Sequence, residues 1–180
     1  DEDKVLRKVK KLVEDIRREI ERILREAERL HKELTRRNEE VLERIRRLVD
    51  KVIKEIRKAD TPDVDRLIKE VRDALRRLEE HNRETLRENE TVADEIRKKV
   101  EELLKRVEEV LETIRKVIEE GKRDLRELLE RVERVIREVR RDLKRLLDES
   151  RDVVRRVEER SRRNLEEVKR DIERVKRELD

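Results

Sequence analysis

The sequence has no cysteine and no aromatic residue, and only one glycine and one proline occur among its 180 residues. Without cysteine, the chain can form neither a disulfide nor a thiolate metal site. Without phenylalanine, tyrosine or tryptophan, it has no ring to stack on a nucleic-acid base. Because glycine and proline form most tight turns, their near absence leaves little from which to build strands, turns and bulges.

Long apolar runs are missing as well. No stretch approaches the roughly 18 apolar residues of a membrane span, and the first segment, DEDKVLRKVK, lacks the features of a signal peptide. The 55 basic and 51 acidic residues are finely mixed, so the net charge of +4 forms no basic face. We therefore expect a soluble chain, of the kind expressed in a bacterial cytoplasm, that requires no cofactor and binds neither nucleic acid nor a membrane.

What the sequence does contain is charge interleaved with aliphatic residues. Charged residues make up 59% of the chain and hydrophobic residues 33%. High charge with low hydrophobicity often indicates disorder, but here Leu, Ile and Val recur about every 3.6 residues. A chain dominated by Glu, Lys, Arg, Leu and Val is typical of long helices or coiled coils. The sequence therefore predicts an all-α fold.

Two short segments interrupt this periodicity. In DTPD, Thr61 is suited to cap a helix and Pro62 to occupy its first position, where the missing N–H costs nothing. In EEGKRD, Gly121 is suited to the left-handed conformation that ends a helix. Asp124 and Glu127 then match a helix cap and its capping-box partner.

These interruptions predict three helices, over about residues 2–59, 62–120 and 124–179. Helices of about 58 residues joined by tight turns must run antiparallel to their neighbours. We therefore expect a single domain over residues 1–180, an antiparallel up-down-up three-helix bundle of nearly straight helices. The alternative is that Gly121 only dents one continuous helix of twice that length.

Polar residues interrupt the apolar stripe near the middle of each predicted helix, most clearly in the segment HNRETLREN, residues 81–89. If the first turn centres near residue 61, Asn38 should lie level with about residues 84 and 158. His31 should lie level with about residues 91 and 151. The polar residues that this arrangement brings to one part of the bundle are His31, Asn38, His81, Asn82, Thr85, Asn89, Ser150, Ser161 and Asn164.

Helical angles of about 100° per residue point these side chains into the bundle, except that His81 lies at the edge of its stripe, as does Thr35. Buried polar groups persist where they complete hydrogen-bond networks, and such networks penalise a shifted register. We therefore predict one or two buried hydrogen-bond layers that fix the register of the helices. The alternative is a solvated surface in the middle of the helices.

The style of the whole chain resembles computationally designed helical bundles with buried hydrogen-bond layers. The resemblance rests on segments such as EELLKRVEEVLETIRKVIEE, on the DTPD connection, on the missing aromatic residues and on the polar positions in the stripes. It involves no family motif, so it implies no catalytic residue. It implies a scaffold, a test of stability or a component of a designed assembly, and membership of no natural family.

An enzyme or a metal site is not expected. The carboxylates are interspersed with Arg and Lys, so no chosen pair is desolvated to tune its acidity. His31 and His81 should lie about 15 Å apart along the axis, too far to share a metal ion. We expect a monomeric structural scaffold that keeps its helicity at about 90 °C. The alternatives are a module that accepts a partner helix or self-associates, and a pH-responsive bundle that uses His31 and His81.

Overall fold

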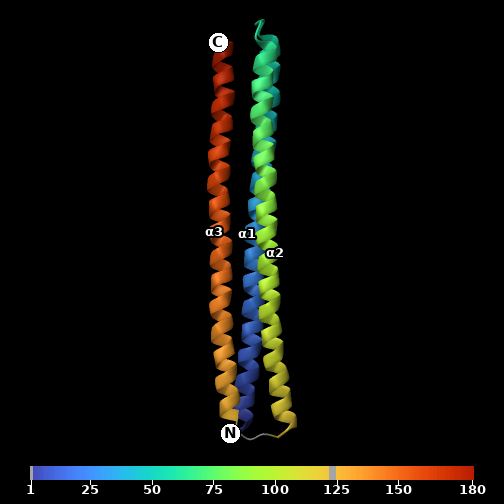
Figure 1. The fold of residues 1–180 in the computed structure, drawn as a ribbon, viewed down its shortest axis with the longest axis vertical. Coiled ribbons are helices and arrows are strands. Elements are labelled where there is room, and N and C mark those ends of the chain that lie inside the picture. The colour runs from blue at the N-terminus through green and yellow to red at the C-terminus, as the bar shows by residue number, and fades with distance from the viewer. Residues whose placement is uncertain (1, 122–124) are drawn as a thin grey trace. The chain divides into compact units, whose positions relative to one another are not determined.

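The computed structural model describes residues 2–121 and 125–180. It contains three helices, α1 (Glu2–Lys58), α2 (Val64–Glu119) and α3 (Leu125–Leu179), and the residues described include no strand (Figure 1). The helices are 57, 56 and 55 residues long. The predicted all-α fold with three helices of nearly equal length is therefore confirmed.

The connection between α1 and α2 differs in detail from the prediction. Helix α2 begins at Val64, about two residues later than expected. Asp63 is the capping residue, because its carbonyl accepts the first helical bond, from Leu67 N at 3.0 Å. Thr61, the predicted cap, instead holds the turn that precedes the helix, where its Oγ1 accepts the backbone N–H of Asp63 at 3.4 Å. Pro62 lies in this turn, since its fixed φ suits a turn as well as a first helical position.

The end of α2 follows the prediction. Gly121 has a φ of 63°, the left-handed conformation expected of it. Its N–H donates to the carbonyl of Ile118 at 3.2 Å. Because α2 ends at Glu119 and α3 begins at Leu125, the alternative of one continuous helix is wrong. The predicted cap, Asp124, lies outside the described residues.

Contacts divide the chain into two compact units, and each unit contains a segment of every helix. Unit 1 consists of Asp1–Leu30 and Val92–Arg151, and unit 2 consists of His31–Thr91 and Asp152–Asp180. Each unit has its own hydrophobic cluster. A single domain over residues 1–180 remains a prediction.

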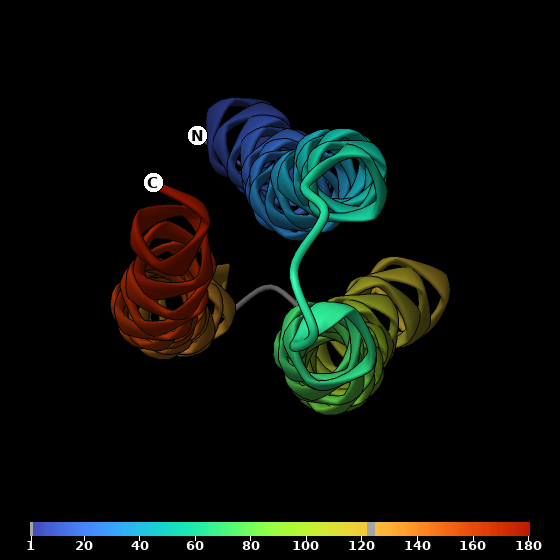
Figure 2. The same cartoon turned by 90° about the horizontal axis from the view of Figure 1, so that it is seen from above.

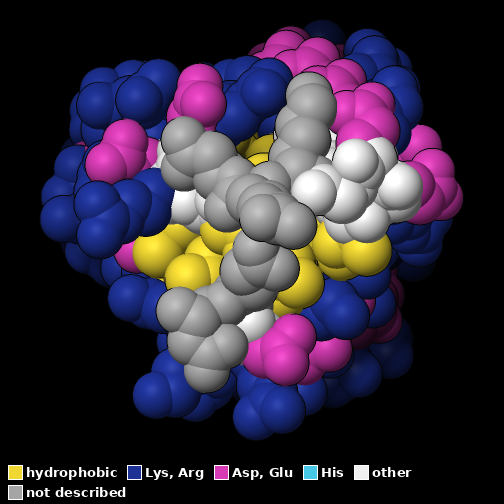
Figure 3. All heavy atoms as spheres, turned by 90° about the horizontal axis from the view of Figure 1, so that it is seen from below, with side chains coloured by type: hydrophobic (Ala, Val, Ile, Leu, Met, Phe, Trp, Pro, Cys, Tyr) yellow, Lys and Arg dark blue, Asp and Glu magenta, His cyan; other side chains and the backbone are white. Residues whose placement is uncertain are grey.

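In unit 1 the three helical segments surround a core of aliphatic side chains. Val9, Ile20 and Val139 are fully buried in it. At the end that carries the N-terminus, hydrophobic side chains gather in the centre, with Lys, Arg, Asp and Glu around them (Figure 3). Ion pairs join α1 to α3 with residue numbers that rise together, and α2 to α3 with numbers that run in opposite directions: Lys8–Glu133, Glu19–Arg140, Glu26–Arg151, Lys99–Glu149 and Arg106–Glu138. Within unit 1, α2 therefore runs antiparallel to the other two helices.

Unit 2 is built in the same way. Its cluster contains fully buried residues of all three helices, among them Val52, Ala74 and Ile172. Arg66 pairs with Glu178, and Arg77 pairs with Asp171 at 2.6 Å, so α2 and α3 are antiparallel here too. Figure 2 looks onto the end of this unit and shows the turn that leads from α1 to α2, with the three helix ends at the corners of a triangle. Nowhere in the described helices is there an apolar stretch that could cross a membrane.

Candidate functional site

Polar side chains lie inside the bundle, on the stripes that are otherwise aliphatic. The buried polar residues of the described chain are His31, Asn38, Asn82, Thr85, Asn89 and Ser150. The other three predicted residues, His81, Ser161 and Asn164, are partly buried. Ser150 belongs to unit 1 and the remaining eight to unit 2. Burial at the first six positions favours the predicted inward orientation, while His81, Ser161 and Asn164 keep some contact with solvent.

The best-connected group consists of His31 and Thr35 on α1 and Asn89 on α2. His31 Nδ1 donates to Asn89 Oδ1 at 2.5 Å. Asn89 Nδ2 donates to the carbonyl oxygen of His31 at 2.9 Å and to Thr35 Oγ1 at 3.1 Å. Thr35 Oγ1 donates to the same carbonyl at 3.1 Å. We call these three residues the His31 cluster.

The His31 cluster is buried, so each of its polar groups requires a hydrogen-bond partner. Asn89 is 2% exposed and His31 is 4% exposed, so any polar group left unpaired there would lose its bonds to water without replacement. The amide of Asn89 uses both of its N–H groups and its oxygen within the cluster. The bonds therefore join α1 to α2 through side chains whose positions are mutually fixed.

Thr35 belongs to this cluster although it is not among the residues predicted to form the layers. Its angle placed it at the edge of the stripe, yet its hydroxyl accepts a bond from Asn89. A signal was available, because Thr35 follows His31 by one helical turn. A threonine at that spacing commonly bonds the carbonyl four residues earlier, which holds the hydroxyl close to the buried face.

A second pair lies on α2. Nε2 of His81 is 3.3 Å from Oγ1 of the buried Thr85. Burial lowers the pKa of His81 below its usual 6.5, and the positive charge of Arg160 on α3 lowers this pKa further. Glu84 acts in the opposite direction and more weakly. The environment of His81 therefore favours the neutral imidazole.

The hydrogen bonds predicted around Asn38 stay a prediction, because two of the atoms concerned have no partner among the described residues. Asn38 Nδ2 and Ser161 Oγ are buried and have no hydrogen-bond partner among the described residues. Asn82 and Asn164 likewise make no side-chain bond to the residues that the structure describes. The structure thus brings His31 and Asn89 together, and His81 and Thr85, while a continuous layer through all three helices stays a prediction.

The levels of the helices agree with the sequence argument. Arg37 on α1 donates to Glu158 on α3 at 2.7 Å, and the two residues are 121 positions apart. The prediction was roughly 120 positions, from helices of equal length. His31 was expected level with about residue 91, and it bonds Asn89. Equal helix lengths were therefore enough to place the polar residues within about one turn.

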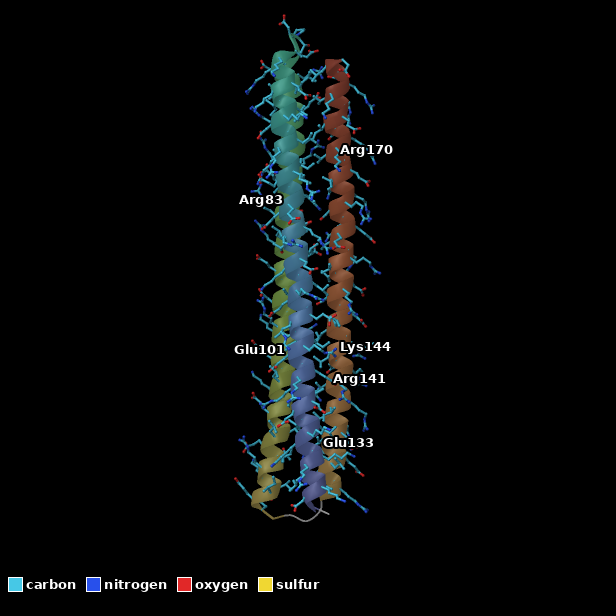
Figure 4. All side chains as sticks on the ribbon, turned by 180° about the vertical axis from the view of Figure 1, so that it is seen from behind. Arg83, Glu101, Glu133, Arg141, Lys144 and Arg170 are labelled. Carbon is cyan, nitrogen blue, oxygen red and sulfur yellow. The ribbon has the colours of Figure 1, made fainter. Side chains whose placement is uncertain are left out.

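The outer surface is covered with charged side chains, some of them in ion pairs. Side chains project outward from the helices, among them the labelled Arg83, Glu101, Glu133, Arg141, Lys144 and Arg170 (Figure 4). Many carboxylates face a cation of a neighbouring helix, as in the pair of Arg106 and Glu138. Over residues 2–121 and 125–180, no three His, Asp or Glu side chains lie close enough together to hold a metal ion.

No curated protein and no solved structure matches the chain. The model of a family described as a domain of unknown function, DUF8042, matches residues 33–130. This range covers more than half of the chain and contains Asn38 and the segment 81–89, together with all of α2. The chain therefore belongs to the DUF8042 family, a domain of unknown function.

Proposed function

We propose that the chain is a structural scaffold, a three-helix bundle whose buried polar residues fix the register of its helices. The observation that carries this proposal is the His31 cluster, in which buried side chains of α1 and α2 bond one another. The proposal assigns the chain no catalytic residue, cofactor or natural biochemical function. It gives the polar residues a role in structure alone.

The reason lies in what a register shift would do to each kind of contact. Leu, Ile and Val side chains recur along every helix, so a slip of one turn would exchange one aliphatic contact for another. The same slip would move Asn89 by about 5.4 Å away from His31. Each buried donor or acceptor left unpaired would then cost about 1–3 kcal/mol. The polar bonds therefore discriminate between registers that the aliphatic contacts leave nearly equal in free energy.

We further propose that the chain is a designed bundle and that it is unusually stable to heat. Long apolar stripes, short connections and paired surface charges support the resemblance to designed bundles. The same features support a bundle that unfolds only above about 90 °C. Both are proposals that follow from the pattern of residues.

The second candidate is an interaction module. Ile118 on α2 is 44% exposed, more than any other large hydrophobic residue described. In unit 1, a groove between α2 and α3 has both apolar and charged lining, with Val110 and Val135 beside Arg106, Glu109 and Arg131. A partner helix or a second copy of the chain would cover such surface. Sedimentation equilibrium distinguishes the two functions, because a monomeric scaffold has a mass of 22.3 kDa and a self-associating module has a multiple of it.

The test of the scaffold proposal removes the His31 cluster as a whole. The variant His31→Leu/Thr35→Val/Asn89→Leu replaces every polar side chain of the cluster by an aliphatic one. Spin labels on cysteines introduced at the exposed positions Arg44 and Arg76 report the level of α1 relative to α2. The chain has no cysteine of its own, so labelling is confined to these two sites.

The expected result is one narrow distance distribution in the parent and at least two in the variant. The second population should be displaced by about one helical turn, 5.4 Å along the axis. The free energy of unfolding should stay equal or rise, because aliphatic side chains replace the polar ones. A labelled Thr91→Val chain is the control, since Thr91 is exposed and bonds only a carbonyl of its own helix. A single, unchanged distance in the triple variant would show that the cluster does not select the register.

A further inference from the structure

Two buried polar atoms of unit 2 have no hydrogen-bond partner among residues 2–121 and 125–180. They are Nδ2 of Asn38 on α1 and Oγ of Ser161 on α3. Asn38 is 8% exposed. Nδ2 carries two N–H donors, and a hydroxyl both donates and accepts. Leaving such groups buried and unpaired is strongly unfavourable, so native structures nearly always supply a partner, from the protein or as an ordered water.

The two groups lie at the same level of the bundle. Arg37 on α1 and Glu158 on α3 form an ion pair in this unit, at 2.7 Å. Asn38 follows Arg37 by one position, and Ser161 follows Glu158 by three, less than one helical turn. Both side chains belong to the inward stripes of their helices. Two unpaired donors of neighbouring helices are thus brought to one part of the interior.

Aliphatic residues of α1 and α3 lie next to Asn38 and Ser161, and polar residues of α2 lie at the same level. On the same stripes, Leu34 precedes Asn38 and Val157 precedes Ser161, and both are almost completely buried. From α2, the buried Asn82 and Thr85 come from the level that the antiparallel arrangement places opposite Asn38. Asn82 makes no side-chain bond to a described residue, so its amide is also available for hydrogen bonding.

We propose that unit 2 contains a buried binding site for ordered water, with Asn38 Nδ2 and Ser161 Oγ as its protein ligands. A water molecule accepts an N–H of Asn38 and exchanges a hydrogen bond with the hydroxyl of Ser161. Its remaining bonds go to polar groups of α2 at this level, which gives it the two to four partners that a buried water requires.

Water fits this site better than an ion does. Both protein ligands are neutral, and the cationic Arg37 nearby is already paired with Glu158. An anion would need an uncompensated positive charge to balance the cost of leaving bulk water. A neutral molecule that both accepts and donates satisfies an amide N–H and a hydroxyl together. The inference concerns bound solvent and does not depend on the scaffold role.

The experiment compares long-lived water in the parent and in variants of the full chain. Oxygen-17 magnetic relaxation dispersion detects water that stays bound longer than the protein takes to tumble, and it is insensitive to exchangeable protein hydrogens. The double variant Asn38→Leu/Ser161→Ala removes both ligands. Thr113→Val is the matched control, because the hydroxyl of Thr113 already bonds the carbonyl of Glu109 in its own helix.

The expected result is a loss of dispersion amplitude corresponding to at least one water in the double variant and no loss in the control. Equal amplitudes in the parent and in a folded double variant would overturn the proposal. A high-resolution crystal structure of the parent provides a second test that does not depend on folding of the variant. Density for a water within hydrogen-bond distance of Asn38 Nδ2 and Ser161 Oγ supports the site. Direct bonds from these two atoms to protein groups, Asn82 among them, would overturn it.

Discussion

Asn89 bonds His31 twice, once through the imidazole and once through the backbone. Its Oδ1 accepts from Nδ1 of His31 at 2.5 Å, while its Nδ2 donates to the carbonyl oxygen of the same residue at 2.9 Å. The second bond fixes which end of the amide faces the imidazole. A rotated amide would place its oxygen against a carbonyl oxygen, where no hydrogen is available to either.

This relationship predicts the tautomer of His31. Because Asn89 presents an acceptor to Nδ1, the neutral imidazole must carry its hydrogen on Nδ1. Two-bond proton–nitrogen correlation spectra at pH 8 should show a protonated Nδ1 and an unprotonated Nε2. In Asn89→Ala, the constraint is lost and the spectrum should move toward the mixture seen in free histidine. A hydrogen found on Nε2 in the parent would contradict the bond.

Truncation of Asn89 should lower the free energy of unfolding. In Asn89→Ala, His31 loses the partner of its imidazole N–H, and the carbonyl of His31 and the hydroxyl of Thr35 lose a donor. At about 1–3 kcal/mol for each unpaired buried group, we expect the free energy of unfolding to fall by about 3 kcal/mol. Guanidinium denaturation measures it. Thr91→Ala, an exposed hydroxyl two positions away on the same helix, should change this free energy by less than about 0.5 kcal/mol.

Gly121 offers a test of backbone conformation without side-chain clashes. Its φ is 63°, and a Cβ added there would meet no atom within 4 Å. In Gly121→Ala the cost is therefore that of the left-handed conformation alone, about 1 kcal/mol of unfolding free energy. Gly121→Asn should cost less, because asparagine tolerates this conformation better than alanine does. Equal losses in the two variants would show that something other than φ sets the cost.

Thermal stability follows from the two hydrophobic clusters. Each fully buried aliphatic side chain contributes about 1.5–3 kcal/mol of transfer free energy, and both clusters draw on all three helices. The connection between α1 and α2 is short as well. We expect the helical circular dichroism signal to persist on heating to about 90 °C. A cooperative transition below about 60 °C, ordinary for natural domains, would show that the aliphatic side chains pack less well than their burial indicates.

The face that each helix buries could be predicted from periodicity. In α1 the stripe from Val9 through Asn38 to Ile56 is buried or partly buried at every predicted position. The finer choice between adjacent residues could not be predicted. Periodicity does not distinguish Leu48 from its neighbour Val49, yet Val49 is almost completely buried and Leu48 only partly. The spacing of 3.6 residues leaves two adjacent positions nearly equivalent, and packing against the partner helices decides between them.

Hydrogen-bond partners were less predictable than burial, for a physical reason. A level along the helix is known to about one turn, 5.4 Å, whereas a hydrogen bond requires its atoms to lie within about 3 Å of each other. The sequence could therefore predict that His31 lies near Asn89, but not that two hydrogen bonds join them. It also could not show that Nδ2 of Asn38, on an equally regular stripe, lacks a hydrogen-bond partner in the part of the chain that the structure describes. These outcomes depend on side-chain rotamers that periodicity does not determine.

The pH-responsive alternative can be tested at His81. Burial and the charge of Arg160 hold the folded-state pKa of His81 below 6.5, the usual value that applies in the unfolded chain. Above that pH both states are neutral, and the folded state keeps its full stability. As the pH falls below 6.5, the unfolded state binds a proton more readily, so the free energy of unfolding decreases. The decrease stops once the pH is below the folded-state pKa, where both states are protonated.

The measurement is guanidinium denaturation at pH 7.5 and at pH 4.5 for the parent and for His81→Gln. Carboxylates titrate over the same range in both chains, so the difference between the chains isolates His81. We expect the parent to lose more stability on acidification than His81→Gln does. In a second variant, Arg160→Met, the nearby positive charge is gone, so the pKa of His81 should rise and the excess loss should shrink. Identical acid losses in the parent and in His81→Gln would contradict a lowered folded-state pKa and remove His81 from any pH response.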